Sequence, residues 1–173
     1  MSILRVNTLQ NTSGNSVITN AGKIIQVQTG MIASQIQYSS GAYSDGPDVN
    51  ITPSSSSNKI LIIGNITIGE GSGGDAHVFL YKDNSVLGAA IGNPVNNATR
   101  STSGLSNGRS AWDTQTSPVF YMDSPSTTSQ VNYEIRCMCS NGPIALNRQQ
   151  NGFQNHANDN SHISYIIAME IAA

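Results

Sequence analysis

The residues best suited to metal or acid–base chemistry are few in this chain and widely separated. Asp75 and His77 stand two apart in a predicted strand, so both side chains can lie on one face and offer two metal ligands. Asp45 and Asp48 offer two carboxylates in a loop that could help to hold calcium. Neither pair has a third ligand nearby, which favours a hydrogen-bonded histidine and a turn. The sequence therefore predicts no metal site and no cofactor.

Signatures of a catalytic nucleophile are missing as well. Ser72 stands among glycines, but Glu70 occupies the position where the Gly-x-Ser-x-Gly pattern needs its first glycine. Cys137 and Cys139 share one face of a strand with Cα atoms about 6.6 Å apart, which is long for a disulfide and favours two buried thiols over a redox pair. We predict that the protein is not an enzyme. A lectin-like capsular depolymerase is the weaker alternative, because no acid pair stands out.

Composition and charge restrict the partners. Apolar residues make up 38% of the chain and charged residues only 10%, and the formal net charge is −2. Eight basic residues scattered along the chain form no footprint for nucleic acid. The longest apolar run, Ile60–Ile63, is too short to cross a bilayer, and the first residues contain no apolar secretion signal. We expect synthesis in a cytoplasm and no membrane insertion.

Binding is the function class that the loops favour. Aromatic and polar residues stand in predicted loops, where stacking and hydrogen bonding to a ligand are common. The receptor-binding candidates are Tyr43, Asp45, Trp112, Phe153 and His156. In the simpler interpretation, Trp112 and Phe153 anchor their long loops to the fold. Uncharged loops rich in Asn and Ser suit a neutral saccharide surface, and they equally suit plain solubility.

Apolar–polar alternation broken by Gly, Pro and Ser predicts eight or nine strands and no helix. Lys59–Gly69 is apolar on both faces and is predicted to be a central strand, and Val131–Cys139 is half buried with its odd-numbered residues inward. Lys23–Thr29 is predicted to turn Ile25 and Val27 inward. Val86–Ile91 is predicted to pair with Ala76–Lys82 across a hairpin turn, and Gly92–Ser117 is predicted to be a long loop. The expected fold is an all-β jelly-roll sandwich spanning residues 22–173.

The C-terminal stretch is the most regular strand pattern in the chain. Its large apolar residues share one face, and they are Ile163, Tyr165, Ile167, Met169 and Ile171. Smaller or mixed residues occupy the other face. Because chain ends usually fray, so apolar an end is expected in the middle of a sheet or at a subunit contact.

Residues 1–21 form a separate predicted segment, a short hairpin or extended piece. Its apolar residues include Ile3, Leu4, Val6 and Leu9, which so small a unit cannot bury alone. We therefore expect the segment to pack on copies of itself or on another protein.

Several stretches together resemble virion structural proteins of tailed phages, in particular tail-fibre or fibre-tip proteins of the marine cyanophage type. They are ILRVNTLQNTSG at 3–14, ITPSSSSNKILII at 51–63, FYMDSP at 120–125, VNYEI at 131–135 and ISYIIAMEI at 163–171. The resemblance covers most of the chain.

The resemblance implies a homotrimeric jelly-roll head similar to tumour-necrosis-factor and complement-type heads, with the C-terminal strand near the threefold axis. It also implies that residues 1–21 dock the head on other proteins of the virion. The expected function is a non-enzymatic appendage whose loops attach to the host surface, with a host glycan as a possible ligand. A capsid decoration or cement protein of the same fold is the alternative.

Overall fold

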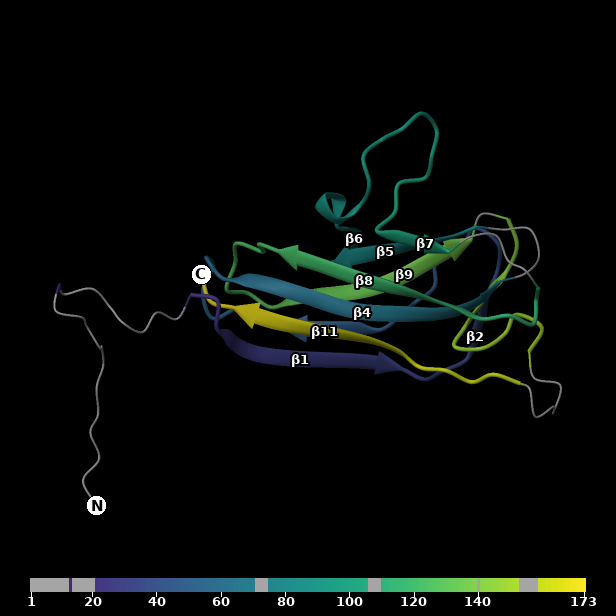
Figure 1. Cartoon of the computed structure of the whole chain (residues 1–173), viewed down its shortest axis with the longest axis horizontal. Helices are drawn as coiled ribbons and strands as arrows, with labels where there is room; N and C mark the ends of the chain where they lie inside the picture. The colour runs from purple at the N-terminus through teal and green to yellow at the C-terminus, as the bar shows by residue number, and fades with distance from the viewer. Residues whose placement is uncertain (1–12, 14–20, 71–74, 106–109, 140, 153–158) are drawn as a thin grey trace, which may run out of the picture.

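The computed structural model describes residue 13 and residues 21–70, 75–105, 110–139, 141–152 and 159–173. Within them the chain forms eleven strands and one 3-10 turn, η1 (Gly88–Ala90). The strands make two antiparallel sheets that pack face to face (Figure 1). The all-β sandwich predicted from the alternation of side chains is therefore confirmed.

The first sheet contains the two strands with the strongest sequence patterns. Its order is β1 (Ile24–Ile32), β11 (Ser164–Ile171), β4 (Lys59–Glu70) and β8 (Gln115–Asp123), as Figure 1 shows. Beyond β11, the second half of β4 pairs with β10 (Ile144–Leu146), which pairs in turn with β2 (Ile36–Tyr38). The C-terminal strand β11 thus lies in the middle of its sheet, and β1 and β8 are the edges on either side of it.

The second sheet is smaller. Its order is β3 (Asp48–Ile51), β9 (Val131–Cys139), β5 (Ala76–Lys82) and β6 (Ser85–Val86), and β7 (Ser103–Leu105) pairs with the first half of β5. Asp83 and Asn84 join β5 to β6 with φ angles of 49° and 62°. Two successive residues with positive φ are what a tight two-residue hairpin needs, as the sequence predicted for this turn.

The core lies between the sheets and takes every second residue of the long strands. Ile60, Ile62, Ile66 and Ile68 of β4 are fully buried, and so are the odd-numbered residues of β9, as predicted. Burial of each large apolar side chain contributes about 1.5–3 kcal/mol. Cys137 and Cys139 belong to this core as free thiols.

Strand β1 has the opposite orientation to the one predicted. Ile25 and Val27, expected to face inward, are 47% and 48% exposed. The reason is Gly30, where β1 passes so close to β3 that an added Cβ would lie 1.7 Å from the carbonyl oxygen of Asp48. Only a residue without a side chain fits there, so from Gln26 to Ile32 the even positions face inward and the odd positions face outward. The register shifts between Ile24 and Gln26, and Ile24 is exposed beside Ile171.

Two other predictions are wrong in detail. The stretch 92–117 was expected to be one loop, but it contains β7 and the first residues of β8. Ser103–Leu105 is a strand because it pairs with β5. The sequence of this stretch has no apolar alternation that would predict a strand. Val86–Ile91 was expected to be a strand, but pairing with β5 ends at Val86, before η1.

The predicted attachment segment, residues 1–21 with Ile3, Leu4, Val6 and Leu9, lies outside the described residues except for Ser13 and Ala21. Its boundary near Gly22 stays a prediction. The described chain enters the first sheet beside its own end, because the N–H of Gly22 donates to the carbonyl oxygen of Ala172 at 2.7 Å. In the described part of the chain, no helix is long and apolar enough to span a membrane.

Candidate functional site

The outer surface of the first sheet is apolar, and none of the described residues covers it. We call it the outer apolar face, and its residues are Val27, Met31, Leu61, Ile63, Phe120, Met122, Tyr165, Ile167, Met169 and Ile171. All ten are exposed or half-buried, and Phe120 and Met31 are 67% and 72% exposed. Alternation along each strand places these side chains opposite to the core.

Strand register arranges this face in three rows that run across the four strands. The rows are Met122–Leu61–Met169–Val27, Phe120–Ile63–Ile167–Thr29 and Pro118–Asn65–Tyr165–Met31. Residues directly opposite one another in antiparallel strands pack side by side on one face. The three rows contain no charged side chain, and Lys59 stands beyond them, opposite Ile171.

The extent of the outer apolar face is large for an isolated domain. Four strands at a spacing of about 4.8 Å and the Lys59–Asn65 stretch at about 3.3 Å per residue give a plane of roughly 400 Å². Side-chain relief makes the accessible area larger than this plane. The largest apolar patch on a typical monomer is about 300–600 Å², and such patches commonly mark protein–protein contacts.

The five C-terminal residues singled out from the sequence lie outside the core between the sheets. Tyr165, Ile167, Met169 and Ile171 face outward, and Ile163 precedes β11 with 53% exposure. The buried face of β11 carries the small or polar residues Ser164, Ala168 and Glu170 together with Ile166. β11 does lie inside its sheet, between β1 and β4, as one of the two expectations for this stretch had it. The assignment of its large apolar residues to a subunit contact stays a prediction.

Glu170 is the polar residue that anchors the end of β11. Its Oε1 accepts hydrogen bonds from the N–H and hydroxyl of Ser54 (2.7 and 2.8 Å) and from Nδ2 of Asn58 (2.6 Å), and its Oε2 accepts one from Nε2 of Gln26 (2.6 Å). Burial by itself raises the pKa of this carboxyl, but the hydrogen bonds outweigh it and lower the pKa to about 2. This network ties β11 to β1 and to the 53–58 connection.

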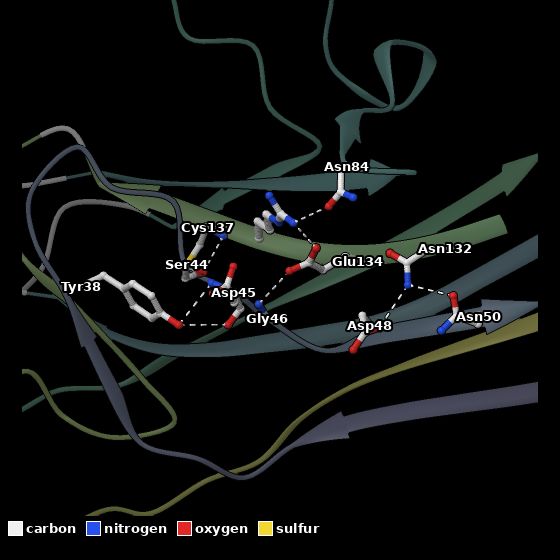
Figure 2. Close-up of polar contacts among 11 residues, drawn as sticks. Tyr38, Ser44, Asp45, Gly46, Asp48, Asn50, Asn84, Asn132, Glu134 and Cys137 are labelled. Atoms are coloured by element: carbon white, nitrogen blue, oxygen red, sulfur yellow. Dashed lines mark hydrogen bonds and ion pairs between the residues drawn. The ribbon is translucent and has the colours of Figure 1, made fainter.

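The outer side of the second sheet carries aromatic side chains together with polar contacts, and Figure 2 shows the polar contacts. Tyr43 forms an isolated antiparallel bridge with Met138 of β9. Its ring packs edge-on against Phe79 (5.4 Å between centroids) and Tyr81 (6.1 Å). Phe79 and Tyr81 are buried, whereas Tyr43 is 43% exposed. Tyr43 therefore covers two aromatic side chains and keeps part of its own ring open to solvent.

Asp45 is fixed through its main chain. The phenol of Tyr38 accepts a hydrogen bond from the Asp45 N–H (3.2 Å) and donates one to the Asp45 carbonyl (3.3 Å). Burial raises the pKa of Tyr38, so the phenol stays protonated and keeps both bonds. Asp45 is exposed, which leaves its carboxylate at the surface beside Tyr43.

Arg136 joins this surface from the centre of β9. Its guanidinium lies 4.5 Å from the centroid of Tyr81, and its Nη2 donates to Glu134 and to Oδ1 of Asn84 (3.1 Å), as Figure 2 shows for the polar contacts. The hydrogen bond to Glu134 raises the pKa of Arg136 further. Among the described residues the buried Nε–H of Arg136 finds no hydrogen-bond partner, although the ring of Tyr81 offers the cation a π face.

This arrangement offers groups that could bind a ligand. The Glu134 carboxylate is already paired, and the thiol of Cys137 is buried in the core against the hydroxyl of Ser44 (3.0 Å). Among the described residues, no three side chains of His, Cys, Asp and Glu gather as a metal site would require. An exposed ring, a surface carboxylate and a fixed cation can provide stacking and hydrogen bonding to a ligand.

Comparison with known proteins gives likenesses at the level of structure alone. No family model matches the sequence, and no curated protein matches it. Solved structures of infectious bursal disease virus are similar in part. They include the Gt strain (12% identity, TM-score 0.45, 98% of this chain and 43% of that chain), the T13 viral particle (14%, 0.45, 97% and 40%) and the VP2 subviral particle (13%, 0.42, 98% and 42%).

This chain spans less than half the length of each of those proteins. At these identities and TM-scores we base no functional conclusion on them.

Of the five receptor-binding candidates, Tyr43 and Asp45 are exposed two residues apart in one connection. Trp112 is 49% exposed in another loop, where the Asn151 N–H donates to the carbonyl oxygen of the neighbouring Ala111 (3.0 Å). Phe153 and His156 lie outside the described residues. Sequence reasoning missed Arg136 and Tyr81, although the alternation of β9 did place Arg136 on its outer face.

Proposed function

We propose that this chain is a non-enzymatic structural protein of a virion and that it forms a homotrimer by covering the outer apolar face with copies of itself. The observation that carries the proposal is that face, with its three uncharged rows across four strands. Burying about 400 Å² at about 25 cal/mol per Å² yields roughly 10 kcal/mol, comparable to the cost of immobilising a partner. Because side-chain relief makes the accessible area of this face larger than 400 Å², the free energy gained by burying it is larger as well.

The difference between the outer surfaces of the two sheets supports a trimer in which the first sheet faces the partner copies. The second sheet turns Asp48, Asn50, Asn132, Glu134 and Arg136 outward, where they form hydrogen bonds and an ion pair. A polar, charged surface needs no cover, whereas the outer apolar face does. In the trimer, the first sheet faces the partner copies and the second sheet faces the surroundings.

The sequence resemblance to phage fibre and fibre-tip proteins supports the virion as the location. In this proposal, residues 1–21 dock the trimer on other virion proteins, and the exposed loops attach to the host. Tyr43 and Asp45 are the candidates for contact with a neutral saccharide, because an exposed ring can stack on a sugar while the carboxylate accepts hydrogen bonds from its hydroxyl groups.

A capsid decoration or cement protein is the second candidate. The observation that favours it is the packing of Tyr43 on Phe79 and Tyr81, which accounts for that ring without any ligand. Such a protein needs the self-association and the docking segment but no receptor site.

The location on the particle distinguishes the two candidates. Antibody raised against this chain should label tails or fibres if it is an attachment protein, and the isolated trimer should block adsorption of the phage to its host. Labelling of the shell, with particles that lose heat resistance but still adsorb when the protein is missing, would instead favour the cement protein. Release of reducing sugar from host polysaccharide by the purified chain would contradict both.

A further inference from the structure

The outer apolar face carries a projection at one edge and a depression at the other. Phe120 stands on the edge strand β8 with 67% of its side chain exposed. On the opposite edge, an open depression of about 400 Å³ is lined by Thr29, Gly30, Met31, Tyr165, Ile166 and Ile167. Phe120 belongs to the same row as Ile167 and Thr29.

The depression follows from the pairing of β1 with β11. Thr29–Ile167 and Met31–Tyr165 are opposite pairs with side chains outward, and the Gly30–Ile166 pair between them turns inward. The walls are therefore side chains, and the floor is main chain at Gly30 and Ile166.

One copy cannot fill its own depression with its own Phe120. The row Phe120–Ile63–Ile167–Thr29 spans three strand spacings, so Phe120 stands roughly 10–14 Å from the depression along the sheet. Both point to the same side of the sheet. The ring therefore reaches a depression only on another copy whose outer apolar face lies against this one.

We propose that Phe120 of one copy occupies the Thr29–Met31/Tyr165–Ile167 depression of the next copy, and that three such contacts close the ring of the homotrimer. This inference rests on the proposed trimer and specifies its contact. In a closed ring each copy presents one surface and receives a different one, and Phe120 and the depression can form such a pair. A twofold dimer would make the same contact twice, and the size of the cross-linked product distinguishes the two assemblies.

Other occupants fit the molecule less well. Trp112 and Val95 are exposed apolar side chains, but they lie in loops and do not belong to the outer apolar face, so inserting either would leave the rows of that face uncovered. Addition of a strand to the free edge of β8 is disfavoured, because Pro118 in its middle has no N–H to donate. Both surfaces of the proposed contact are uncharged, so no ionic group is buried when they meet.

Disulfide cross-linking of the full chain tests the contact. We expect the double variant Phe120→Cys/Met31→Cys, and likewise Phe120→Cys/Thr29→Cys, to give covalent trimers under oxidation that reduction dissolves. Phe120→Cys alone should give none. Val95→Cys/Met31→Cys is the matched control and should stay uncross-linked, since Cys137 and Cys139 are buried in the core.

The size of the cross-linked species, and whether one forms at all, distinguish the trimer, a dimer and a monomer. Covalent dimers without trimers would overturn the three-membered ring. If light scattering finds the unmodified chain trimeric while both double variants fail to cross-link, the proposed contact is wrong and the proposed assembly stands. A monomeric unmodified chain would overturn both proposals.

A charge at the projection provides a second measurement. Phe120→Glu should raise the dissociation constant of the trimer at least about 30-fold, the effect of removing a dominant interface side chain. Val95→Glu, at a comparably exposed position, should leave it unchanged. Equal assembly of the two variants would contradict the contact, and circular dichroism of each variant checks that the sheets are intact.

Discussion

Glu170 keeps a charge inside the protein with the help of neutral groups only. Its four hydrogen bonds come from Gln26, Ser54 and Asn58, which join the end of β11 to two other segments. A carboxylate buried without a cation is stable only when its oxygen atoms are satisfied in this way. The C-terminal strand is thus held by the hydrogen-bond network of Glu170 as well as by its pairing with β1 and β4.

The hydrogen-bonded carboxyl of Glu170 makes the stability of the fold depend on pH in the acid range. Because the folded pKa is about 2 and the ordinary value is 4.5, the ionised carboxyl stabilises the fold fully above pH 4.5. That contribution, about 3 kcal/mol, should be lost as the pH falls from 4.5 towards 2. Urea unfolding of the protein and of Glu170→Gln at one protein concentration measures it. The variant should be less stable at pH 7 and should lack this part of the pH dependence, and parallel pH profiles would contradict the assignment.

Asp123 connects the two sheets at the end of β8. One of its oxygen atoms accepts hydrogen bonds from the phenol of Tyr133 (2.6 Å) and from the ammonium group of Lys82 (2.8 Å), both in the second sheet. Burial raises the pKa of Tyr133, with the hydrogen bond to Asp123 adding to it.

We expect Tyr133→Phe to lower the free energy of unfolding by about 1–3 kcal/mol, because it leaves a buried, charged acceptor with one donor fewer. Tyr121→Phe removes a phenol from the same region and is the matched control, with an expected change below about 0.5 kcal/mol. Chemical denaturation of both variants measures the difference. Equal effects would show that the hydrogen bond to Asp123 contributes nothing specific.

Tyr43 and Asp45 bear the binding part of the proposed function. If they contact a host saccharide, Tyr43→Ala and Asp45→Ala should each weaken binding to host cells at least about 10-fold. Val95→Ala, an exposed apolar loop position away from them, should not. All three variants should remain trimeric, which separates recognition from assembly. Full binding by both Tyr43 and Asp45 variants would remove these residues from the receptor site and favour the cement protein.

At the scale of strands, the sequence predicts which stretches pair but does not always predict which face is buried. β4 and β9 lie where their sequence patterns placed them, because these patterns are long. β11 alternates equally well, yet its smaller face is the inner one. Ile135 reaches from β9 to within 2.7 Å of the place where a Cβ on Gly64 would stand, and Gly64 pairs with Ile166. The inner face of β11 therefore has little room for large side chains, and this limit comes from β4 and β9 and not from the sequence of β11 itself.

The same limit explains the outcome for β1 and for the candidate sites. Close approach at Gly30 sets which residues of β1 face outward, and no local pattern contains the position of β3. Tyr43 and Asp45 are two apart, so their proximity was predictable, whereas Arg136 and Tyr81 join them only through the pairing of β9 with β5. β7 was missed for the same reason, since its pairing with β5 defines it.

The two faces of β11 should respond differently to substitution. Ala168→Leu adds volume to the inner face and should lower the free energy of unfolding by about 1–3 kcal/mol, as overpacking usually does. Met169→Leu, one residue further and on the outer face, should cost less than about 1.5 kcal/mol, because it conserves volume. Thermal unfolding at a fixed protein concentration compares them. A larger loss for Met169→Leu would contradict the assignment of the inner face.

At the scale of the molecule, one feature connects fold and function. The sandwich buries a complete core between its sheets and still leaves ten large apolar side chains on the outside of one sheet. The other sheet is polar, with hydrogen bonds and an ion pair on its outer surface. A protein with such unequal surfaces is soluble when the apolar one is covered, and copies of the chain provide a cover of matching chemistry.

The molar mass of the full chain in solution tests this most directly. Light scattering on the purified protein at micromolar concentration should give three times the mass of one chain, and Ile167→Glu, which places a charge in the middle row, should reduce it. A well-folded, soluble monomer would show that the outer apolar face tolerates water without a partner. That result would contradict the proposed assembly and the function built on it.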